Sequence, residues 1–174
     1  MKTKDIVSIS LFTTLLAVCA WIYIPMTIPF TMQTFAVFLA MLVLGGKKGT
    51  IVIFIYLLSG FLGVPVFSGG TAGPVVLLGP TGGYMIGWIF LGLLFWGTEK
   101  LTFQRKKLEI LVLVIGLLIC YLVGTFWFVN IYANEGTSAA YGAAFSACVL
   151  PFVIPDLVKL ALAYTVSKRI KKFI

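Results

Sequence analysis

The chain has 174 residues, of which 61% are hydrophobic and only 10% are charged. Polar side chains are too few to cover a water-soluble protein of this size, so the composition predicts an integral membrane protein. The sequence has no histidine, which excludes serine-histidine dyads and the usual zinc and haem sites. It also has no GxxxxGK[ST] motif, which excludes ATP hydrolysis by a P-loop in this chain.

Apolar runs separated by charged or Gly/Pro-rich stretches predict six membrane-spanning helices. The expected spans are residues 6–24, 31–45, 49–63, 80–98, 108–132 and 142–167. Each crossing takes roughly 20 apolar residues, so residues 1–174 are expected to form one all-α membrane domain with no separate soluble domain. The first run begins like a secretory signal, but it is longer than a signal and ends at Pro25 without a cleavage site. We therefore expect it to remain as the first helix.

Twelve of the thirteen basic residues fall in four clusters, and two predicted spans separate each cluster from the next. All four clusters then lie on one side, which the positive-inside rule makes cytoplasmic. Both termini are expected inside the cell membrane, in a multi-pass arrangement surrounded by lipid. Topology accounts for the net charge of +8, so no nucleic-acid partner is expected. The clusters are Lys2 and Lys4; Lys47 and Lys48; Lys100, Arg105, Lys106 and Lys107; and Lys168, Arg169, Lys171 and Lys172.

The first span carries a stripe of small residues. Ser10, Thr13, Ala17 and Ala20 follow one another at spacings of three, four and three positions, which places them on one helix face. Such a stripe lets another helix approach closely. The approaching helix belongs either to the protein's own bundle or to a partner membrane protein.

The segment at residues 63–84 is rich in glycine. Seven glycines and three prolines are mixed with Val and Leu rather than with charged residues. Non-helical backbone at membrane depth is tolerated only against protein or a wet cavity. We expect this segment to fold back as a cap over an outward-facing cavity, and the loop at residues 63–79 to close over a ligand. An ordinary flexible outer loop is the alternative.

The motif GPTGGY ends this segment. Pro80 suits the first turn of a helix, Thr81 can cap it, and Gly82 and Gly83 keep side chains away from the backbone. A helix N-terminus presents unpaired N–H groups and a partial positive charge, which suits a carboxylate or a polarised carbonyl. Close packing between helices is the alternative explanation for the glycines.

Asp156 and Lys159 are charged residues inside the last predicted span. Their spacing of three positions places them on one helix face. Each charge costs roughly 2.5–3.5 kcal/mol in hydrocarbon, so both are expected to face the bundle interior or a wet cavity. Pro155 lacks a backbone N–H, which predicts a kink or restart with Asp156 in the first turn. The alternatives are an internal ion pair without a ligand, and a Lys159 side chain that extends to the cytoplasmic interface.

Gln33 and Asn130 are further polar residues in apolar surroundings, at the start of the second span and near the outer end of the fifth. Each offers donors and an acceptor, either to a ligand or to a neighbouring helix. Tyr84 and Trp88 lie one helical turn apart after the glycines and can line a pocket, although simple packing is favoured for Trp88.

The motif GPTGGY in the fourth span and the motif PDLVK, residues 155–159, in the sixth together resemble the BioY family. These proteins are the biotin-binding S-components of energy-coupling factor (ECF) transporters. The resemblance extends over essentially the whole chain. It implies the six-helix S-component fold, capture of biotin from outside, and assembly with a transmembrane coupling subunit and two ATP-binding subunits, so that ATP acts only on the partners. Some members of the family are reported to transport without these subunits.

The resemblance also assigns roles to residues. In the family, partners dock on an alanine-x-x-x-alanine pattern of the first helix; here Ser10, Thr13 and Ala17 form the matching stripe, with only one alanine. Biotin has a ureido ring with two N–H donors and a carbonyl, an apolar thioether ring and a valerate carboxylate. Asp156 can accept from a ureido N–H and Lys159 can neutralise the carboxylate, although which residue meets which end is left open. The predicted binding residues are Gln33, Thr81, Gly82, Gly83, Tyr84, Asn130, Asp156 and Lys159.

The sequence also allows two other functions. A stand-alone or proton-coupled small-molecule carrier would use Asp156 as a titrating group. An intramembrane enzyme is disfavoured because the sequence has neither a paired acidic motif nor a nucleophile-base arrangement. No cofactor and no metal are expected, and biotin enters only as the transported ligand.

Overall fold

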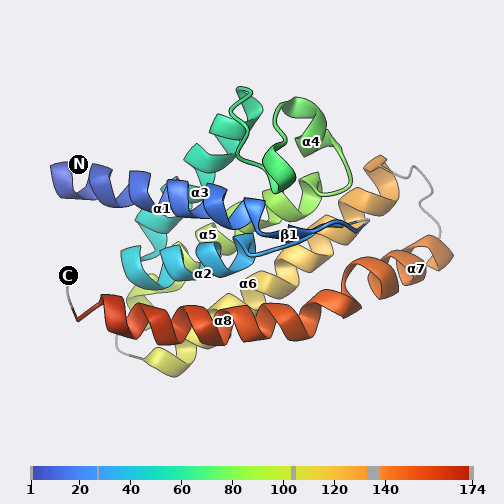
Figure 1. Cartoon of the computed structure of the whole chain (residues 1–174). Coiled ribbons are helices and arrows are strands. Elements are labelled where there is room, and N and C mark those ends of the chain that lie inside the picture. Colours follow the sequence, from blue (N-terminus) through green and yellow to red (C-terminus); the bar gives the residue numbers. More distant parts are fainter. Residues whose placement is uncertain (1, 27, 103–104, 133–137, 173–174) are drawn as a thin grey trace.

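The computed structural model places long helices side by side, with one short β-hairpin between the first two (Figure 1). It describes residues 2–26, 28–102, 105–132 and 138–172. The helices are α1 (Thr3–Trp21), α2 (Gln33–Leu44), α3 (Gly46–Phe61), α4 (Pro74–Leu78), α5 (Gly82–Thr102), α6 (Lys106–Trp127), α7 (Ser138–Cys148) and α8 (Leu150–Ile170). The smaller elements are strands β1 (Tyr23–Ile24) and β2 (Phe30–Thr31), a 3-10 turn η1 (Ser68–Gly70) and a π-helical turn η2 (Phe128–Tyr132).

Helix α2 lies at the centre of the bundle. Its residues 36–42 are all buried, and it packs against α1, α3 and α8. The segment Gln33–Leu44 carries no charged residue, and a helix that is apolar on all sides is normally buried on all sides. Only Gly45 separates α2 from α3, and its φ of 81° is a conformation that favours glycine.

Helices α5 and α6 form the most extensive helix pair. Glycines bring their backbones together: a Cβ on Gly87 would lie 2.8 Å from the Cα of Cys120, and one on Gly116 would lie 2.7 Å from Leu91 Cγ. Lipid gives helices little hydrophobic reason to associate, so small residues at the contact are a common basis for packing in membranes. The glycine content of these two segments is therefore explained in part by their packing.

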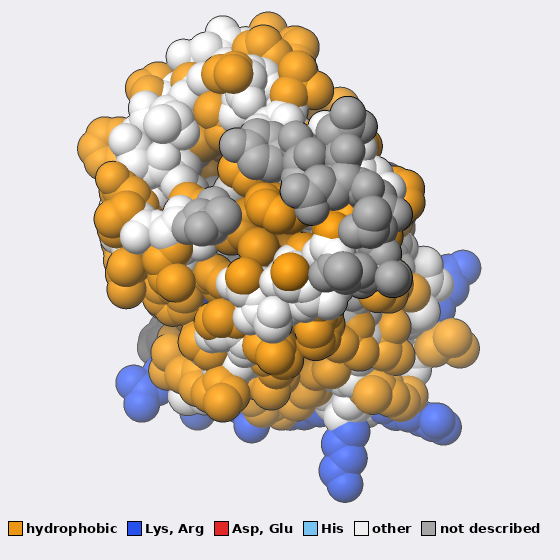
Figure 2. All heavy atoms as spheres, turned by 90° about the vertical axis from the view of Figure 1, so that its right-hand side faces the viewer, with side chains coloured by type: hydrophobic (Ala, Val, Ile, Leu, Met, Phe, Trp, Pro, Cys, Tyr) orange, Lys and Arg blue, Asp and Glu red, His pale blue; other side chains and the backbone are white. Residues whose placement is uncertain are grey.

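The four basic clusters share one end of the bundle. Both termini lie there, together with the α2–α3 turn and the beginning of α6 (Figure 1). The β1–β2 hairpin and α7 lie toward the opposite end. Figure 2 looks onto that opposite end, where Lys and Arg side chains appear only at the margins of the view. The described part of this face is apolar or uncharged, as the sequence predicts for loops without Lys or Arg.

Three helices are long and apolar enough to cross a membrane: Thr3–Trp21, Lys106–Ile131 and Ala140–Ile170, within the described residues. Helix α2 is apolar but has only 12 residues. The observed fold is thus all-helical with membrane-compatible helices. The number of crossings remains a prediction.

The first helix ends earlier than predicted. It stops at Trp21 instead of residue 24, because Tyr23 and Ile24 pair with Thr31 and Phe30 in an antiparallel hairpin. Backbone pairing of this kind depends on a partner segment further along the chain, so hydrophobicity alone does not reveal it. The hairpin replaces the simple outer loop expected at residues 25–30.

The break in the last predicted span also lies elsewhere. Val149 has non-helical dihedral angles (φ −120°, ψ −55°) and separates α7 from α8. Helix α8 therefore begins at Leu150, Pro151 occupies its first turn, and Pro155 lies inside the helix. Asp156 consequently lies in the second turn, not in the first turn as predicted, because Pro151 rather than Pro155 takes the helix-initiating position.

The glycine-rich segment is folded against the bundle. Phe67 is fully buried and its ring packs on Gly60 of α3, while the Gly73 N–H donates to the Gly60 carbonyl at 2.8 Å. The Tyr56 hydroxyl of α3 donates to the carbonyl of Val66 at 2.9 Å. These contacts describe an ordered cap, with η1 and α4 inside it, rather than a simple loop.

Candidate binding site

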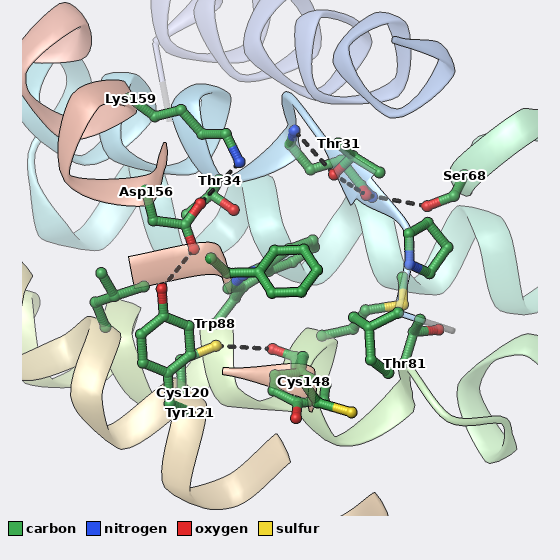
Figure 3. Close-up of a pocket in the computed structure, with 17 residues that line it drawn as sticks. Thr31, Thr34, Ser68, Thr81, Trp88, Cys120, Tyr121, Cys148, Asp156 and Lys159 are labelled. Carbon is green, nitrogen blue, oxygen red and sulfur yellow. Dashed lines mark hydrogen bonds and ion pairs between the residues drawn. The ribbon is translucent and has the colours of Figure 1, made fainter. Parts of the chain in front are cut away.

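A cavity lies beneath the hairpin, η1 and the start of α5 (Figure 3). It provides about 70 Å³ for the centres of water-sized spheres, and a single water needs roughly 10–15 Å³ by this measure. The cavity therefore has room for a few water molecules as it stands. Its lining residues are Ile28, Pro29, Thr31, Gln33, Thr34, Ser68, Thr81, Tyr84, Met85, Trp88, Leu117, Cys120, Tyr121, Cys148, Phe152, Asp156 and Lys159.

A buried ion pair forms one wall of this cavity. Lys159 Nζ lies 2.7 Å from Asp156 Oδ1, and the two residues are only 3% and 4% exposed. Tyr121 of α6 donates its hydroxyl to Asp156 Oδ2 at 2.7 Å, and Figure 3 shows both contacts. The sequence predicted that Asp156 and Lys159 would face the interior, and the structure confirms this. Lys159 does not extend to the basic end of the bundle.

One aromatic ring, that of Phe30, covers the ammonium group of Lys159. Lys159 Nζ lies 4.0 Å from the centroid of the Phe30 ring, a cation–π geometry. Phe30 belongs to β2 and stacks on Phe152 of α8, with ring centroids 6.2 Å apart. The hairpin therefore contacts the charged wall of the cavity directly.

Gln33 is a buried lining residue that joins three elements around the cavity. Its Oε1 accepts hydrogen bonds from Thr31 Oγ1 at 2.7 Å and Ser68 Oγ at 3.2 Å, and its Nε2 donates to Tyr56 Oη at 2.5 Å. Through Tyr56, the network reaches the backbone of Val66. Gln33 thus lines the cavity as predicted and also connects the hairpin, α3 and the glycine-rich segment.

The start of α5 contributes Thr81 and Tyr84 to the lining, but the predicted ligand contacts of Gly82 and Gly83 are not supported. Helix α5 begins at Gly82, directly after Thr81, whose carbonyl accepts from Met85 N–H. Neither glycine lines the cavity. A Cβ on Gly82 would collide with the Leu77 carbonyl, and one on Gly83 with Trp127. Their small size is explained by packing against α4 and α6, the alternative that the sequence left open.

Asn130, another of the predicted binding residues, also lies outside the lining of this cavity. Its Nδ2 donates to the Phe126 carbonyl at 2.9 Å and to the hydroxyl of Tyr141 on α7. It therefore connects η2 to α7, in keeping with hydrogen bonding between helices. On α1, Ser10 is exposed, whereas Thr13 and Ala17 are half-buried at the edge of the bundle.

Sequence reasoning missed several lining residues. Tyr121 binds Asp156, and Ser68 reaches Gln33 across 35 positions of the chain. A tyrosine in the middle of an apolar span needs a partner for its hydroxyl. This signal was available in the sequence and would have pointed to Tyr121. Thr31 and Thr34 carried no comparable signal. Trp88 lines the cavity, although simple packing was the favoured interpretation.

The arrangement suits an uncharged polar group that offers both a donor and an acceptor. A carboxylate and an ammonium lie side by side, and aromatic and aliphatic side chains surround them. A buried pair of this kind leaves hydrogen-bonding positions on both partners, which a ligand group with complementary donors and acceptors can fill.

Comparisons with known proteins agree with this arrangement. The sequence matches the BioY family over residues 1–174. It is 38% identical to the probable biotin transporter BioY of Pyrococcus horikoshii, over 98% of each chain. It is 40% identical to the biotin transporter BioY of Thermotoga maritima, over 97% of this chain and 96% of the relative.

A solved structure agrees as well. The fold resembles the crystal structure of the S-component for biotin from an ECF-type ABC transporter, with a TM-score of 0.84 and 25% sequence identity, over 99% of this chain and 95% of that one. The relatives are named as transporters and S-components, not as enzymes. Together, the family match over the full length and the shared fold show that this chain belongs to the BioY family.

Proposed function

We propose that this chain captures biotin as the S-component of an ECF-type transporter in the cell membrane. The observation that carries the proposal is the buried Asp156–Lys159 pair in the wall of a cavity at the end of the bundle opposite the basic clusters. The relatives named as biotin transporters and the shared fold support the choice of ligand.

The proposed topology has six crossings and both termini in the cytoplasm. The crossings are α1, α2, α3, α5, α6 and the α7–α8 pair. Support comes from the basic clusters, which share one end of the bundle (Figure 1), and from the positive-inside rule, which assigns such an end to the cytoplasm. The cavity then opens to the exterior, where an imported vitamin arrives.

The ureido ring of biotin is proposed to bind at the ion pair. Lys159 Nζ and Asp156 Oδ1 are only 2.7 Å apart, so one ligand group must meet both. A ureido carbonyl can accept from Lys159 while a neighbouring N–H donates to Asp156. The valerate carboxylate is a poor fit, because it would lie against the carboxylate of Asp156, and like charges repel. The two charged residues therefore share one end of biotin instead of dividing its two ends.

The thioether ring and the carboxylate of biotin are matched to lining residues of suitable chemistry. The thioether ring suits the apolar wall that includes Trp88 and Phe152, and the carboxylate suits the hydroxyl group of Thr81. The hydroxyl groups of Thr31 and Ser68 already donate to Gln33. Among the described lining residues, Lys159 is the only cation, so the carboxylate is held by neutral donors.

Entry of biotin requires movement at the mouth, because the present cavity holds only a few waters. The segment at residues 63–79 is proposed to open and close over the ligand, with the bond from Ser68 to Gln33 made in the closed form. Limited proteolysis tests this: biotin should slow cleavage within the segment by several-fold. Identical cleavage with and without biotin would contradict closure.

Transport is proposed to require partners. A transmembrane coupling subunit and two ATP-binding subunits would supply the ATP hydrolysis, because this chain has no P-loop. The stripe of Ser10, Thr13 and Ala17 on α1 is the proposed docking surface, since small residues permit close approach of a second helix.

The deciding experiment measures binding and uptake separately. Purified protein should bind biotin unchanged and in preference to other vitamins in equilibrium titration. Cells that lack the partner subunits should lose biotin uptake while the isolated chain still binds it. Uptake that persists without any ATPase and collapses with an uncoupler would identify a proton-coupled carrier instead. Absence of biotin binding by folded protein would end the proposal.

A further inference from the structure

A second cavity lies between the first turn of α6 and the end of α8. Both of these helix ends belong to the basic end of the bundle (Figure 1). Four lysines line the cavity: Lys106 from α6, Lys168 from the last turn of α8, and Lys171 and Lys172, which directly follow α8. It provides about 430 Å³ for the centres of water-sized spheres, compared with about 70 Å³ in the candidate binding cavity. It is therefore the roomier of the two and lies at the opposite end of the molecule.

The positive charge of this cavity is largely unbalanced. Glu109 is the one acidic residue among its lining residues. In the described part of the chain, none of the four lysines has a carboxylate oxygen within ion-pair distance, in contrast to Lys48, which lies 2.5 Å from Asp5. Lys168 instead places its Nζ 4.2 Å from the centroid of the Tyr164 ring. An anion that enters the cavity would gain contacts that the protein itself does not supply.

The convergence of these lysines needs an explanation beyond topology. The positive-inside rule accounts for lysines at this end of the bundle. It does not account for their position around one cavity, where Lys106 at the start of α6 lies near Lys168, Lys171 and Lys172 at the end of α8, more than 60 positions further along the chain. Basic pockets between spanning helices on the cytoplasmic side are a recurrent way to bind phosphate-bearing lipid headgroups.

We propose that this cavity binds the phosphate of an anionic phospholipid from the cytoplasmic leaflet. Both helices that line it are among those long and apolar enough to span the membrane, so the cavity lies where such a span leaves the lipid. The ligand class is a lipid phosphate with net negative charge, such as phosphatidylglycerol. A zwitterionic lipid offers the same phosphate but adds a cation, which the lysines repel.

Native mass spectrometry of the full chain in mild detergent tests this site, with phosphatidylglycerol and phosphatidylcholine as the two probes. The unaltered protein should retain phosphatidylglycerol at least tenfold better than phosphatidylcholine. The variant Lys168→Gln/Lys171→Gln/Lys172→Gln should lose at least tenfold in phosphatidylglycerol retention. The variant Lys2→Gln/Lys4→Gln/Lys47→Gln removes the same charge outside the cavity and should stay within about twofold of the unaltered protein.

Each other outcome overturns the proposal. Equal losses in the two triple variants would mean attraction by net charge alone, and no loss in the first variant would mean that the cavity does not bind the lipid. Displacement of the lipid by excess inorganic phosphate alone would indicate a site for a free anion. Biotin binding, at the opposite end, should be equal in both variants and reports their folding. If the first triple variant does not fold, Lys171→Gln alone should still lower retention by at least threefold.

Discussion

Removal of Lys159 alone should damage the protein more than removal of Lys159 together with its charge partner. Lys159 and Asp156 are 3% and 4% exposed. The variant Lys159→Met leaves the Asp156 carboxylate buried with the Tyr121 hydroxyl as its hydrogen-bond donor, and breaking a buried pair in this way costs about 3–5 kcal/mol. Asp156→Asn/Lys159→Met removes both charges with little change in volume. Replacement of a whole buried pair is often neutral or stabilising, so the double variant should regain most of the lost stability.

Biotin binding, unlike stability, should not recover in the double variant. Both variants lack the Lys159 ammonium proposed to meet the ureido carbonyl, and the double variant also lacks the Asp156 carboxylate, so each should bind biotin at least tenfold more weakly, a loss of about 1.4 kcal/mol or more. Thermal unfolding in detergent measures stability, and isothermal titration calorimetry measures affinity; Lys4→Met, at an exposed position of α1, is the control. A double variant with unaltered affinity would show that the pair is an internal ion pair without a ligand. Unaltered stability of Lys159→Met would refute the reasoning about the buried charge.

Three further substitutions test the surroundings of this pair and the surface of α1. Tyr121→Phe removes a 2.7 Å hydrogen bond to Asp156, of a kind worth about 1.5–3 kcal/mol. This variant should bind biotin about tenfold more weakly in calorimetry. The control Tyr141→Phe, outside the cavity, should leave the affinity unchanged. Phe30→Leu removes a cation–π contact worth about 0.5–2 kcal/mol and should speed biotin release several-fold in stopped-flow measurements; an unchanged rate would contradict a role for the ring. Ser10→Leu alters an exposed position of α1 and should reduce co-purification of partner subunits while biotin affinity stays constant; undiminished co-purification would exclude Ser10 from the docking surface.

Local signals in the sequence were enough to locate the charged wall of the cavity. Asp156 and Lys159 were identifiable because two charges three positions apart in an apolar span share a helix face and cannot both meet lipid. The same kind of reasoning located the start of α5 at the GPTGGY motif to within two residues. These features depend on neighbours along the chain, which a single sequence displays.

Features that depend on distant segments were beyond such reasoning. The bond from Ser68 to Gln33 and the contact of Phe30 with Lys159 join residues that only the fold brings together. The same limit applies to Gly83, where ligand access and close helix packing both favour glycine and only the neighbouring Trp127 supports packing. Asn130 was ambiguous for the same reason, since an amide serves a ligand and a neighbouring helix equally well.

Helix α3 has contacts toward both ends of the molecule. On the side of the hairpin, Tyr56 is hydrogen-bonded to Gln33 and to Val66; near its other end, Lys48 forms an ion pair with Asp5 of α1 at 2.5 Å. A helix of 16 residues is about 24 Å long, so one continuous element joins these two sets of contacts. A shift of Tyr56 during the proposed opening of the glycine-rich segment would therefore act on the contact between Lys48 and Asp5, at the basic end of the bundle.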